Sequence, residues 1–303
     1  MRKVIGIGET VLDIIFKNDM PVNAVPGGSV FNGLISLARS GISTTFISET
    51  GNDRIGDRIV SFLKENGVDT SNVCRHKETK SPLSLAFLND SNDAEYVFYK
   101  DHPHDRLEFT YPEVNADDVV MFGSFYAVNP VIRQQVSDFL QYAKSHGAII
   151  YYDVNFRASH VNDVIKVTPN LLENLELADI VRGSNEDFMT LFGHNDADKV
   201  YRSDVSFYCR NFIYTQGAGP VELRAEGGVS RSYHVEPMET VSRVGAGDNF
   251  NAGIVYGMLH DGITRRRIAE GLSVAEWDKL IASGQRFAAE CCKSIYNYIQ
   301  AGV

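Results

Sequence analysis

Cysteine, long apolar runs and positive charge are all scarce in this sequence. The four cysteines include no Cys-x-x-Cys spacing, and the adjacent Cys291 and Cys292, in a helical pattern, cannot readily bridge each other. We interpret all four as buried thiols in a reducing compartment, so the cytoplasm is the expected location. No apolar run reaches the roughly 18 residues of a spanning helix. Glycine and Glu9 interrupt the start too early for a signal peptide.

The charge balance and the missing motifs argue against several functions. A net charge of −10 disfavours a nucleic-acid or polyanionic-membrane partner, although a local basic site for phosphates stays open. The glycine-lysine phosphate loop is absent, and Gly6-x-Gly8 lacks the third glycine of a dinucleotide site. Neither Gly-x-Ser-x-Gly nor His-Glu-x-x-His occurs, and there is no internal repeat or linker. The 303 residues, 44% of them hydrophobic, fit one large α/β domain or two ordinary ones.

Strand and helix patterns alternate along most of the chain. This spacing predicts right-handed βαβ units around a mostly parallel sheet. The predicted strands are 3–8, 44–48, 118–123, 148–152, 179–182 and 211–215, and the predicted helices include 30–38, 130–146, 169–177 and a last long one at 274–299.

One region breaks this alternation. Segments 83–88 and 95–99 flank a polar turn with no helix between them, which predicts an antiparallel hairpin. With segment 10–25 the hairpin could form a separate small sheet, so we assign a lid to about 10–26 and 81–101. Its exposed face could pair with another subunit as a homodimer. Nearby, His102-Pro-His104-Asp105 could hold a metal, but the proline and the lack of further histidine or cysteine favour a polar loop.

Two glycine turns open directly into helical sequence. Gly27-Gly28-Ser29 precedes the helix at 30–38, with Asn32 about one turn in, and Gly245-Ala-Gly-Asp248 precedes another apolar-periodic run. Glycines let the backbone approach a ligand, and a helix N-terminus attracts anions. A carboxylate beside an anion site suits phosphoryl transfer to a hydroxyl. An ordinary glycine-rich loop before a buried helix explains the same residues, so both interpretations stay open at this point.

Two further stretches carry polar groups in apolar surroundings. Asp13 is a lone carboxylate in the strand-like segment 10–16, where a turn or edge position is favoured over a ligand for substrate hydroxyls. Asp153-Val-Asn155-Phe-Arg157 follows a strand, at the sheet edge where open α/β sheets bind ligands. An ion pair between Asp153 and Arg157 explains that stretch equally well.

Six stretches, taken together and in order, resemble the ribokinase-like (PfkB) carbohydrate kinases over nearly the whole chain. The resemblance implies a single domain at 1–303 with the three-layer α/β/α ribokinase-like fold, a mostly parallel central sheet and a small β lid. It also implies a kinase that uses ATP, Mg²⁺ and a small sugar, and it favours the anion-site interpretation above. The stretches are Gly6–Asp13, Gly27–Asn32, Gly51–Gly56, Asp153–Arg157, Thr215–Gly217 and Gly245–Asp248.

The resemblance assigns roles position by position. Asp248 matches the base that takes the proton from a sugar's primary hydroxyl, kept ionised by its helix N-terminus. The amides of Gly245, Ala246 and Gly247 match an anion hole for the transferring phosphoryl group. Closure of the lid would exclude water. Positions matching sugar or phosphate contacts are Asp13, Gly28, Asn32, Asn155 and Arg157, and those matching the nucleotide turn are Thr215 and Gly217.

Three positions depart from the family pattern. Ser242-Arg243 replace the Asp-Thr of the family's monovalent-cation site, which puts potassium activation in doubt. We hypothesise that Arg243 supplies a fixed charge beside the anion hole instead. Ser184 and Asp187 end the segment matching the family's Asn-x-x-Glu, leaving Glu186 and Asp187 to hold Mg²⁺ through water. Pro220 stands where a glycine usually follows the nucleotide turn.

The same resemblance bears on the substrate. Chain length, Asp153–Arg157 and Phe98-Tyr-Lys100 followed by Asp105 are most similar to the fructokinase branch, which implies fructose. Arg157 also suits a sugar acid such as 2-keto-3-deoxygluconate, and ribose or a nucleoside is a further alternative. An alternative to an enzyme is a sugar-sensing binding protein that keeps the fold without turnover, which the altered positions 184, 242 and 243 would allow. The intact Gly245–Asp248 favours the enzyme.

Overall fold

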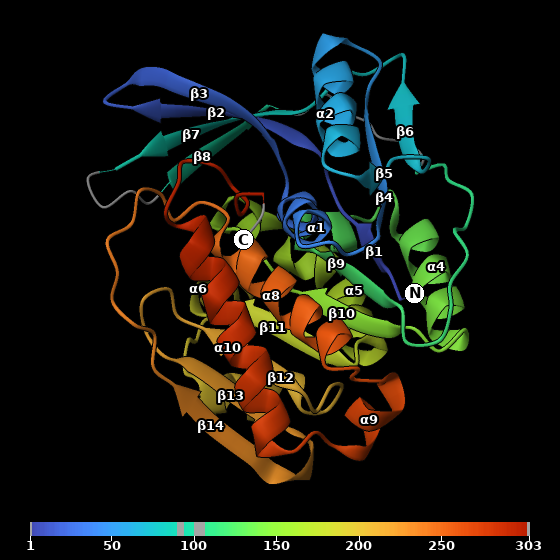
Figure 1. Ribbon diagram of the computed structural model, residues 1–303, viewed down its shortest axis with the longest axis vertical. Coiled ribbons are helices and arrows are strands. Elements are labelled where there is room, and N and C mark those ends of the chain that lie inside the picture. Colours follow the sequence, from blue (N-terminus) through green and yellow to red (C-terminus); the bar gives the residue numbers. More distant parts are fainter. Residues whose placement is uncertain (1, 90–93, 100–106, 302–303) are drawn as a thin grey trace.

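Two β-sheets organise the residues that the computed structural model describes, which are 2–89, 94–99 and 107–301 (Figure 1). The larger sheet has the order β14-β13-β12-β11-β10-β9-β1-β4-β5, with β6 also paired to β4. Strands from β12 to β5 run parallel, whereas β13 and β14 add an antiparallel edge. Its strands are β1 (Val4–Ile7), β4 (Thr44–Gly51), β5 (Val68–Asp69), β6 (Val73–His76), β9 (Val119–Gly123), β10 (Ile149–Asp153), β11 (Ile180–Ser184), β12 (Phe212–Thr215), β13 (Val221–Ala225) and β14 (Val229–Tyr233).

Helices cover both faces of this sheet and give the predicted three layers (Figure 1). Consecutive strand residues point to opposite faces. In β9, Val119 and Met121 therefore pack in one core cluster and Val120 and Phe122 in the other. The first cluster lies under α1 (Ser29–Arg39), α2 (Arg54–Glu65), α8 (Ala246–His260), α9 (Arg265–Glu270) and α10 (Val274–Cys291). The second lies under α3 (Ser124–Val128), α4 (Arg133–Ser145), α5 (Val164–Leu177), α6 (Asn185–Phe192) and α7 (Ala197–Val200).

The smaller sheet has the order β3-β2-β7-β8 and projects from the larger one (Figure 1). Its strands are β2 (Val11–Lys17), β3 (Met20–Gly27), β7 (Leu83–Leu88) and β8 (Ala94–Tyr99). The predicted hairpin and its pairing with the early segment are therefore present. Asp13, Ser84 and Phe98 lie side by side in the register and face the body, whereas Val97 and Tyr99 of β8 are 41% and 57% exposed.

Three predicted helices differ in extent from the observed ones. The helix predicted at 130–146 begins only at Arg133, because the proline at 130 lies in the turn between α3 and α4. The helix predicted at 169–177 begins earlier, at Val164, with Pro169 inside it. The last helix ends at Cys291 instead of continuing to 299. Residues 297–299 are buried beyond the end of the helix: Tyr298 and Ile299 pack in the first core cluster, and the Asn297 side chain is hydrogen-bonded.

Two sequence predictions concern segments beyond these elements. His102-Pro-His104-Asp105 lies outside the described residues. In the described part of the chain, no helix combines the length and apolar character needed to cross a membrane.

Candidate active site

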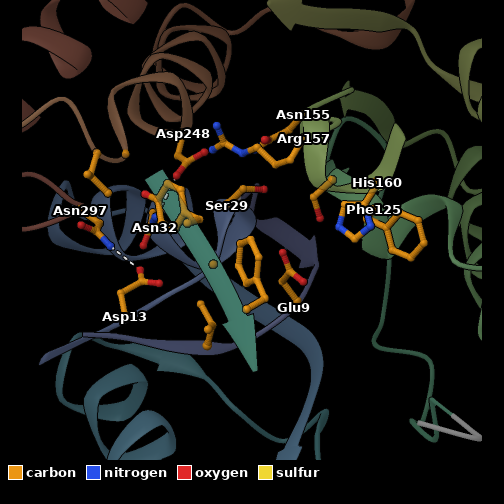
Figure 2. A pocket seen from close by; sticks show the side chains of 17 residues that line it. Glu9, Asp13, Ser29, Asn32, Phe125, Asn155, Arg157, His160, Asp248 and Asn297 are labelled. Carbon is orange, nitrogen blue, oxygen red and sulfur yellow. Dashed lines mark hydrogen bonds between the residues drawn. The ribbon is translucent and has the colours of Figure 1, made fainter. Parts of the chain in front are cut away.

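One pocket lies between the smaller sheet and the start of α8 (Figure 2). It brings together residues far apart in sequence, with Asp13, Asn32 and Asn297 towards one end and Phe125 and His160 towards the other. Seven of the predicted site residues line it: Asp13, Gly28, Asn32, Asn155, Arg157, Gly245 and Asp248. Further lining residues that the sequence analysis did not assign include Glu9, Ser29, Tyr96, Phe125, His160 and Asn297.

The Gly245–Asp248 turn is shaped by backbone contacts. Gly245 caps α8 with φ of 80°, and a Cβ there would lie 2.5 Å from the carbonyl oxygen of Asn297, so glycine is required. Asn249 strengthens the turn, since its Nδ2 donates to the carbonyls of Gly245 at 2.7 Å and Asn297 at 2.8 Å. Asp248 is held in the first turn of α8, where helix amides lack internal partners.

Asp248 is buried and hydrogen-bonded to a neutral amide. Asn32 Nδ2 of α1 donates to its Oδ2 at 2.8 Å. Burial raises the pKa of Asp248 to about 7, against the lowering effects of the Asn32 hydrogen bond and the Arg157 and Arg182 charges. We expected the helix N-terminus to keep this carboxylate ionised; the cost of burial is larger than that effect. A pKa near neutrality suits a group that must accept and release a proton.

Asp13 occupies neither a turn nor a sheet edge, so the structural interpretation favoured from sequence was wrong. It lies in β2, between β3 and β7, with its side chain buried. Asn297 Nδ2 donates to its Oδ2 at 2.8 Å (Figure 2), and the Ser84 hydroxyl donates to its Oδ1. Burial raises the pKa of Asp13 to about 6, and those two hydrogen bonds oppose the shift.

The Asp153–Arg157 ion pair considered from sequence gives way to a different pairing. Arg182 Nη1 of β11 donates to Asp153 Oδ1 at 2.9 Å. Arg157 instead reaches the pocket, and its guanidinium lies 5.7 Å from the ring centre of Tyr96 on the smaller sheet. Such a cation–π contact ties the body to that sheet.

A ring pair closes the other end of the pocket. The rings of Phe125 and His160 stack at 3.9 Å (Figure 2). His160 also lies 3.8 Å from the Asp163 carboxylate. Arg157 and His160 are the basic side chains named in the lining of this pocket, and Glu9, Asp13 and Asp248 supply its carboxylates.

The chain matches the pfkB family carbohydrate kinase model over residues 1–297. It belongs to the PfkB family. It is 28% identical over 248 residues to the 5-dehydro-2-deoxygluconokinase of Geobacillus thermodenitrificans, covering 77% of this chain and 72% of that relative. It is 25% identical over 307 residues to fructokinase-1 of Oryza sativa, covering 95% and 90%. A solved double mutant of the Vibrio cholerae O395 fructokinase, with fructose, ADP and potassium bound, matches with TM-score 0.85, 18% identity and coverage of 99% and 95%.

The predicted nucleotide turn of this PfkB kinase lies outside the pocket. Thr215 ends β12, and its Oγ1 accepts from Arg182 Nη2 at 2.6 Å. Gly217 follows with φ of 60°, a conformation that favours glycine, and a Cβ there would meet nothing within 4 Å. The turn therefore offers open space at its surface, linked to the body of the kinase through Arg182.

The predicted magnesium ligands are differently placed. Both oxygens of Asp187 accept backbone amides, from Phe156 at 2.8 Å and Ser184 at 2.7 Å, the latter completing a capping box for α6. Glu186 is exposed. Across the described residues, no group of three His, Cys, Asp or Glu side chains could hold a metal ion. The residues thus do not fit a dedicated magnesium site.

The segment before Gly245 has a serine where the family's monovalent-cation site has its aspartate. Ser242 is buried where the family has aspartate, and its Oγ accepts from the amide of Val244 at 3.2 Å. The Arg243 side chain is exposed and outside the pocket lining. Its carbonyl accepts from the amide of Ala246 at 3.2 Å. A hydroxyl engaged in its own turn is a poor substitute for a carboxylate ligand.

Two residues that the sequence analysis did not assign, Asn297 and Arg182, contact the residues that it did assign. Asn297 was placed in a helix, since nothing in Cys291–Ile299 resembles a helix stop such as glycine or proline. Arg182 did carry a signal, because a basic residue ended a strand pattern at the carboxyl edge of the sheet. The family motifs drew attention to its neighbours instead.

Proposed function

We propose that this PfkB kinase phosphorylates a primary hydroxyl of a small ketose, most closely fructose, with ATP as donor and Asp248 as the base. The observation that carries the proposal is the position of Asp248. It is buried at the N-terminus of α8, in one pocket with Asp13, Asn155 and Arg157, and its pKa is about 7. Asp13 and Asn32 would orient sugar hydroxyls, and the amides at the start of α8 would meet the phosphoryl group, with that of Ala246 leaving its hydrogen bond to the Arg243 carbonyl.

In the proposed transfer the protein forms no covalent bond to the phosphoryl group. The sugar oxygen forms a bond to the γ-phosphorus as the bond to the bridging oxygen of ADP breaks, and the hydroxyl proton passes to Asp248. Negative charge spreads over the phosphoryl oxygens, where the amides of Gly245, Ala246 and Gly247 would stabilise it. Asp248 then releases its proton to solvent, which a pKa of about 7 permits.

The nucleotide would lie on the other side of this turn, at Thr215 and Gly217. Because Asp187 is engaged in the α6 cap, we propose that Mg²⁺ arrives on the phosphates of ATP and meets Glu186 and Asp187 through water. The smaller sheet would act as the lid at about 10–26 and 81–101, excluding water when the sugar is bound.

A sugar panel with magnesium and ATP, read by ADP release, tests the proposal. Fructose should give the highest kcat/KM, and ribose and a nucleoside should give less, because Asp13 and Asn32 are set for the hydroxyl pattern of one sugar. No ADP release above the sugar-free rate with any member would overturn the kinase proposal and favour a sugar-sensing binding protein.

A second candidate substrate is a sugar acid, such as 5-dehydro-2-deoxygluconate or 2-keto-3-deoxygluconate. Arg157 and His160 both line the pocket and could pair with a carboxylate. A relative that is 28% identical is a 5-dehydro-2-deoxygluconokinase. Comparing wild type with Arg157→Gln separates the candidates, since a carboxylate substrate should lose far more affinity than fructose does.

The outer face of the lid supports one further proposal, a homodimer. Val97 and Tyr99, which alternate along β8 with the pocket-lining Phe98, leave large apolar side chains exposed there. Light scattering on wild type and Val97→Lys checks it: the wild type should run as a dimer, and the charged variant should shift to monomer.

A further inference from the structure

Arg182 is a buried guanidinium with one nitrogen that has no hydrogen-bond partner. It is 7% exposed, near the carboxyl end of β11. Nη1 donates to Asp153 of β10 and Nη2 to Thr215 of β12, while Nε is buried without a hydrogen-bond partner. Buried N–H groups are almost always satisfied, so this guanidinium keeps hydrogen-bonding capacity that its protein partners do not use.

The same guanidinium lies against the Gly245–Asp248 turn. A Cβ on Gly247 would lie 3.0 Å from Nη2 and 3.3 Å from Nη1, and the three heavy atoms nearest to it all belong to Arg182. Glycine at 247 thus leaves room for the guanidinium. One side chain touches both Thr215, in the predicted nucleotide turn, and Gly247, in the predicted anion hole.

We infer that Arg182 is a catalytic residue, the fixed cation that contacts the transferring phosphoryl group. The inference rests on the proposed function. A phosphate chain that runs from the turn at Thr215 to the hydroxyl beside Asp248 would pass Gly247, against which the guanidinium lies. As the bond from the sugar oxygen to phosphorus forms and the bond to ADP breaks, charge on the phosphoryl oxygens is balanced by Arg182, which gives up no proton.

Two other arginines lie elsewhere relative to the turn. Arg157 lies on the sugar side, against Tyr96 of the lid. The Arg243 side chain is exposed, although we predicted it as the charge beside the anion hole. Arg182 is also held rigidly by Asp153 and Thr215, so little reorganisation is needed when charge develops.

The test uses three variants of the full-length kinase. Arg182→Gln removes the charge, Arg182→Lys keeps it, and the double variant Asp153→Asn with Arg182→Gln avoids leaving a buried carboxylate unpaired. Arg133→Gln is the matched control, because Arg133 is equally buried and paired with Glu173 on the opposite face of the sheet. Thermal unfolding reports the fold of each variant.

Two readouts follow, kinetics and nucleotide binding by calorimetry. With the charge removed, kcat should fall by about 10³-fold while the sugar KM changes little, the scale of an arginine that stabilises phosphoryl transfer. The preference for a non-hydrolysable ATP analogue over ADP should fall by about tenfold, with ADP affinity nearly unchanged. Arg182→Lys should restore part of kcat and part of the preference for the ATP analogue. Arg133→Gln should match wild type in these two measurements.

Two outcomes would overturn the inference. One is a folded double variant whose kcat stays within about tenfold of wild type. The other is an equal loss of affinity for ADP and the ATP analogue, which would make Arg182 a support for Thr215 only. Failure of the proposed function is distinguishable: the wild type would phosphorylate no sugar, yet the nucleotide preference would still report on Arg182.

Discussion

The carboxylates on the two sides of the Gly245–Asp248 turn are held by different partners. On the pocket side, Asp248 and Asp13 accept hydrogen bonds from neutral amides and a hydroxyl, and burial raises their pKa values to about 7 and about 6. On the side of Thr215, Asp153 is paired with the Arg182 guanidinium. Burial raises the pKa of Asp153 as well, against the lowering effect of the Arg182 charge. The two sets of carboxylates therefore differ in their partners: Asp248 and Asp13 are held by neutral donors and are free to pair with a substrate, whereas Asp153 fixes a cation in place.

The largest loss of turnover is expected from Asp248→Asn. Turnover should fall by at least about 100-fold, the scale of a positioned base, while sugar affinity measured by calorimetry is largely retained. Asp118→Asn is the control, since Asp118 is equally buried but accepts backbone amides far from the pocket. Unchanged ATP-dependent turnover in the Asp248 variant would exclude it as the base.

The same variant should change stability in a pH-dependent way. The pKa of Asp248 lies near 7 when folded, against an ordinary value of 3.8, so the folded state binds more protons between about pH 4 and 7. Wild-type stability therefore falls as pH rises through that window. Asp248→Asn should melt higher than wild type at pH 8 and show a smaller gain at pH 5. A gain that does not grow with pH would contradict the raised pKa.

Asp13→Asn should have a smaller effect, confined to the sugar. Losing a hydrogen bond to a charged group costs about 10- to 100-fold in kcat/KM for the sugar, carried mainly by KM. The KM for ATP should stay the same, because Asp13 lies on the lid side of the pocket. Equal increases in both KM values would show that Asp13 supports the fold of the site rather than the sugar.

The dependence of kcat/KM on pH should report the pKa values of Asp248 and Asp13. As pH falls below about 7, protonation of Asp248 should reduce kcat/KM, approaching tenfold per pH unit. Asp13, with a pKa of about 6, should steepen the fall at lower pH. Stopped assays across pH 5 to 9 in buffers of constant ionic strength check this. A flat profile across that range would mean that neither carboxylate titrates with turnover.

The smallest expected effect is that of potassium. Ser242 is engaged with Val244 and offers no carboxylate, so turnover in sodium, potassium and tetramethylammonium buffers should agree within about twofold. Arg243→Ala should likewise stay within about twofold, because its side chain is exposed. Strong potassium dependence would show that the cation site survives without its aspartate.

The fold was largely predictable because its signals are local. Alternating strands and helices predicted the parallel sheet, and the helix-free stretch around 83–99 predicted the hairpin of the smaller sheet. Asp13, Asn32, Asn155 and Asp248 stand in motif positions, and the structure brings these four residues together in one pocket.

What could not be predicted depends on tertiary packing. The pairing of Asp153 depended on which basic side chain the neighbouring strand places beside it, a property of register between β10 and β11. Asn297 lies in a segment whose local pattern continues a helix, yet burial against the body bends it back. The pKa of Asp248 followed from burial that no sequence pattern measures.

The Asn297–Asp13 hydrogen bond joins residues 284 positions apart. Closing so long a loop costs chain entropy that the buried contact must repay. The pocket therefore depends on a segment far along the chain from Asp13, and it is complete only in a chain that has been translated past Asn297.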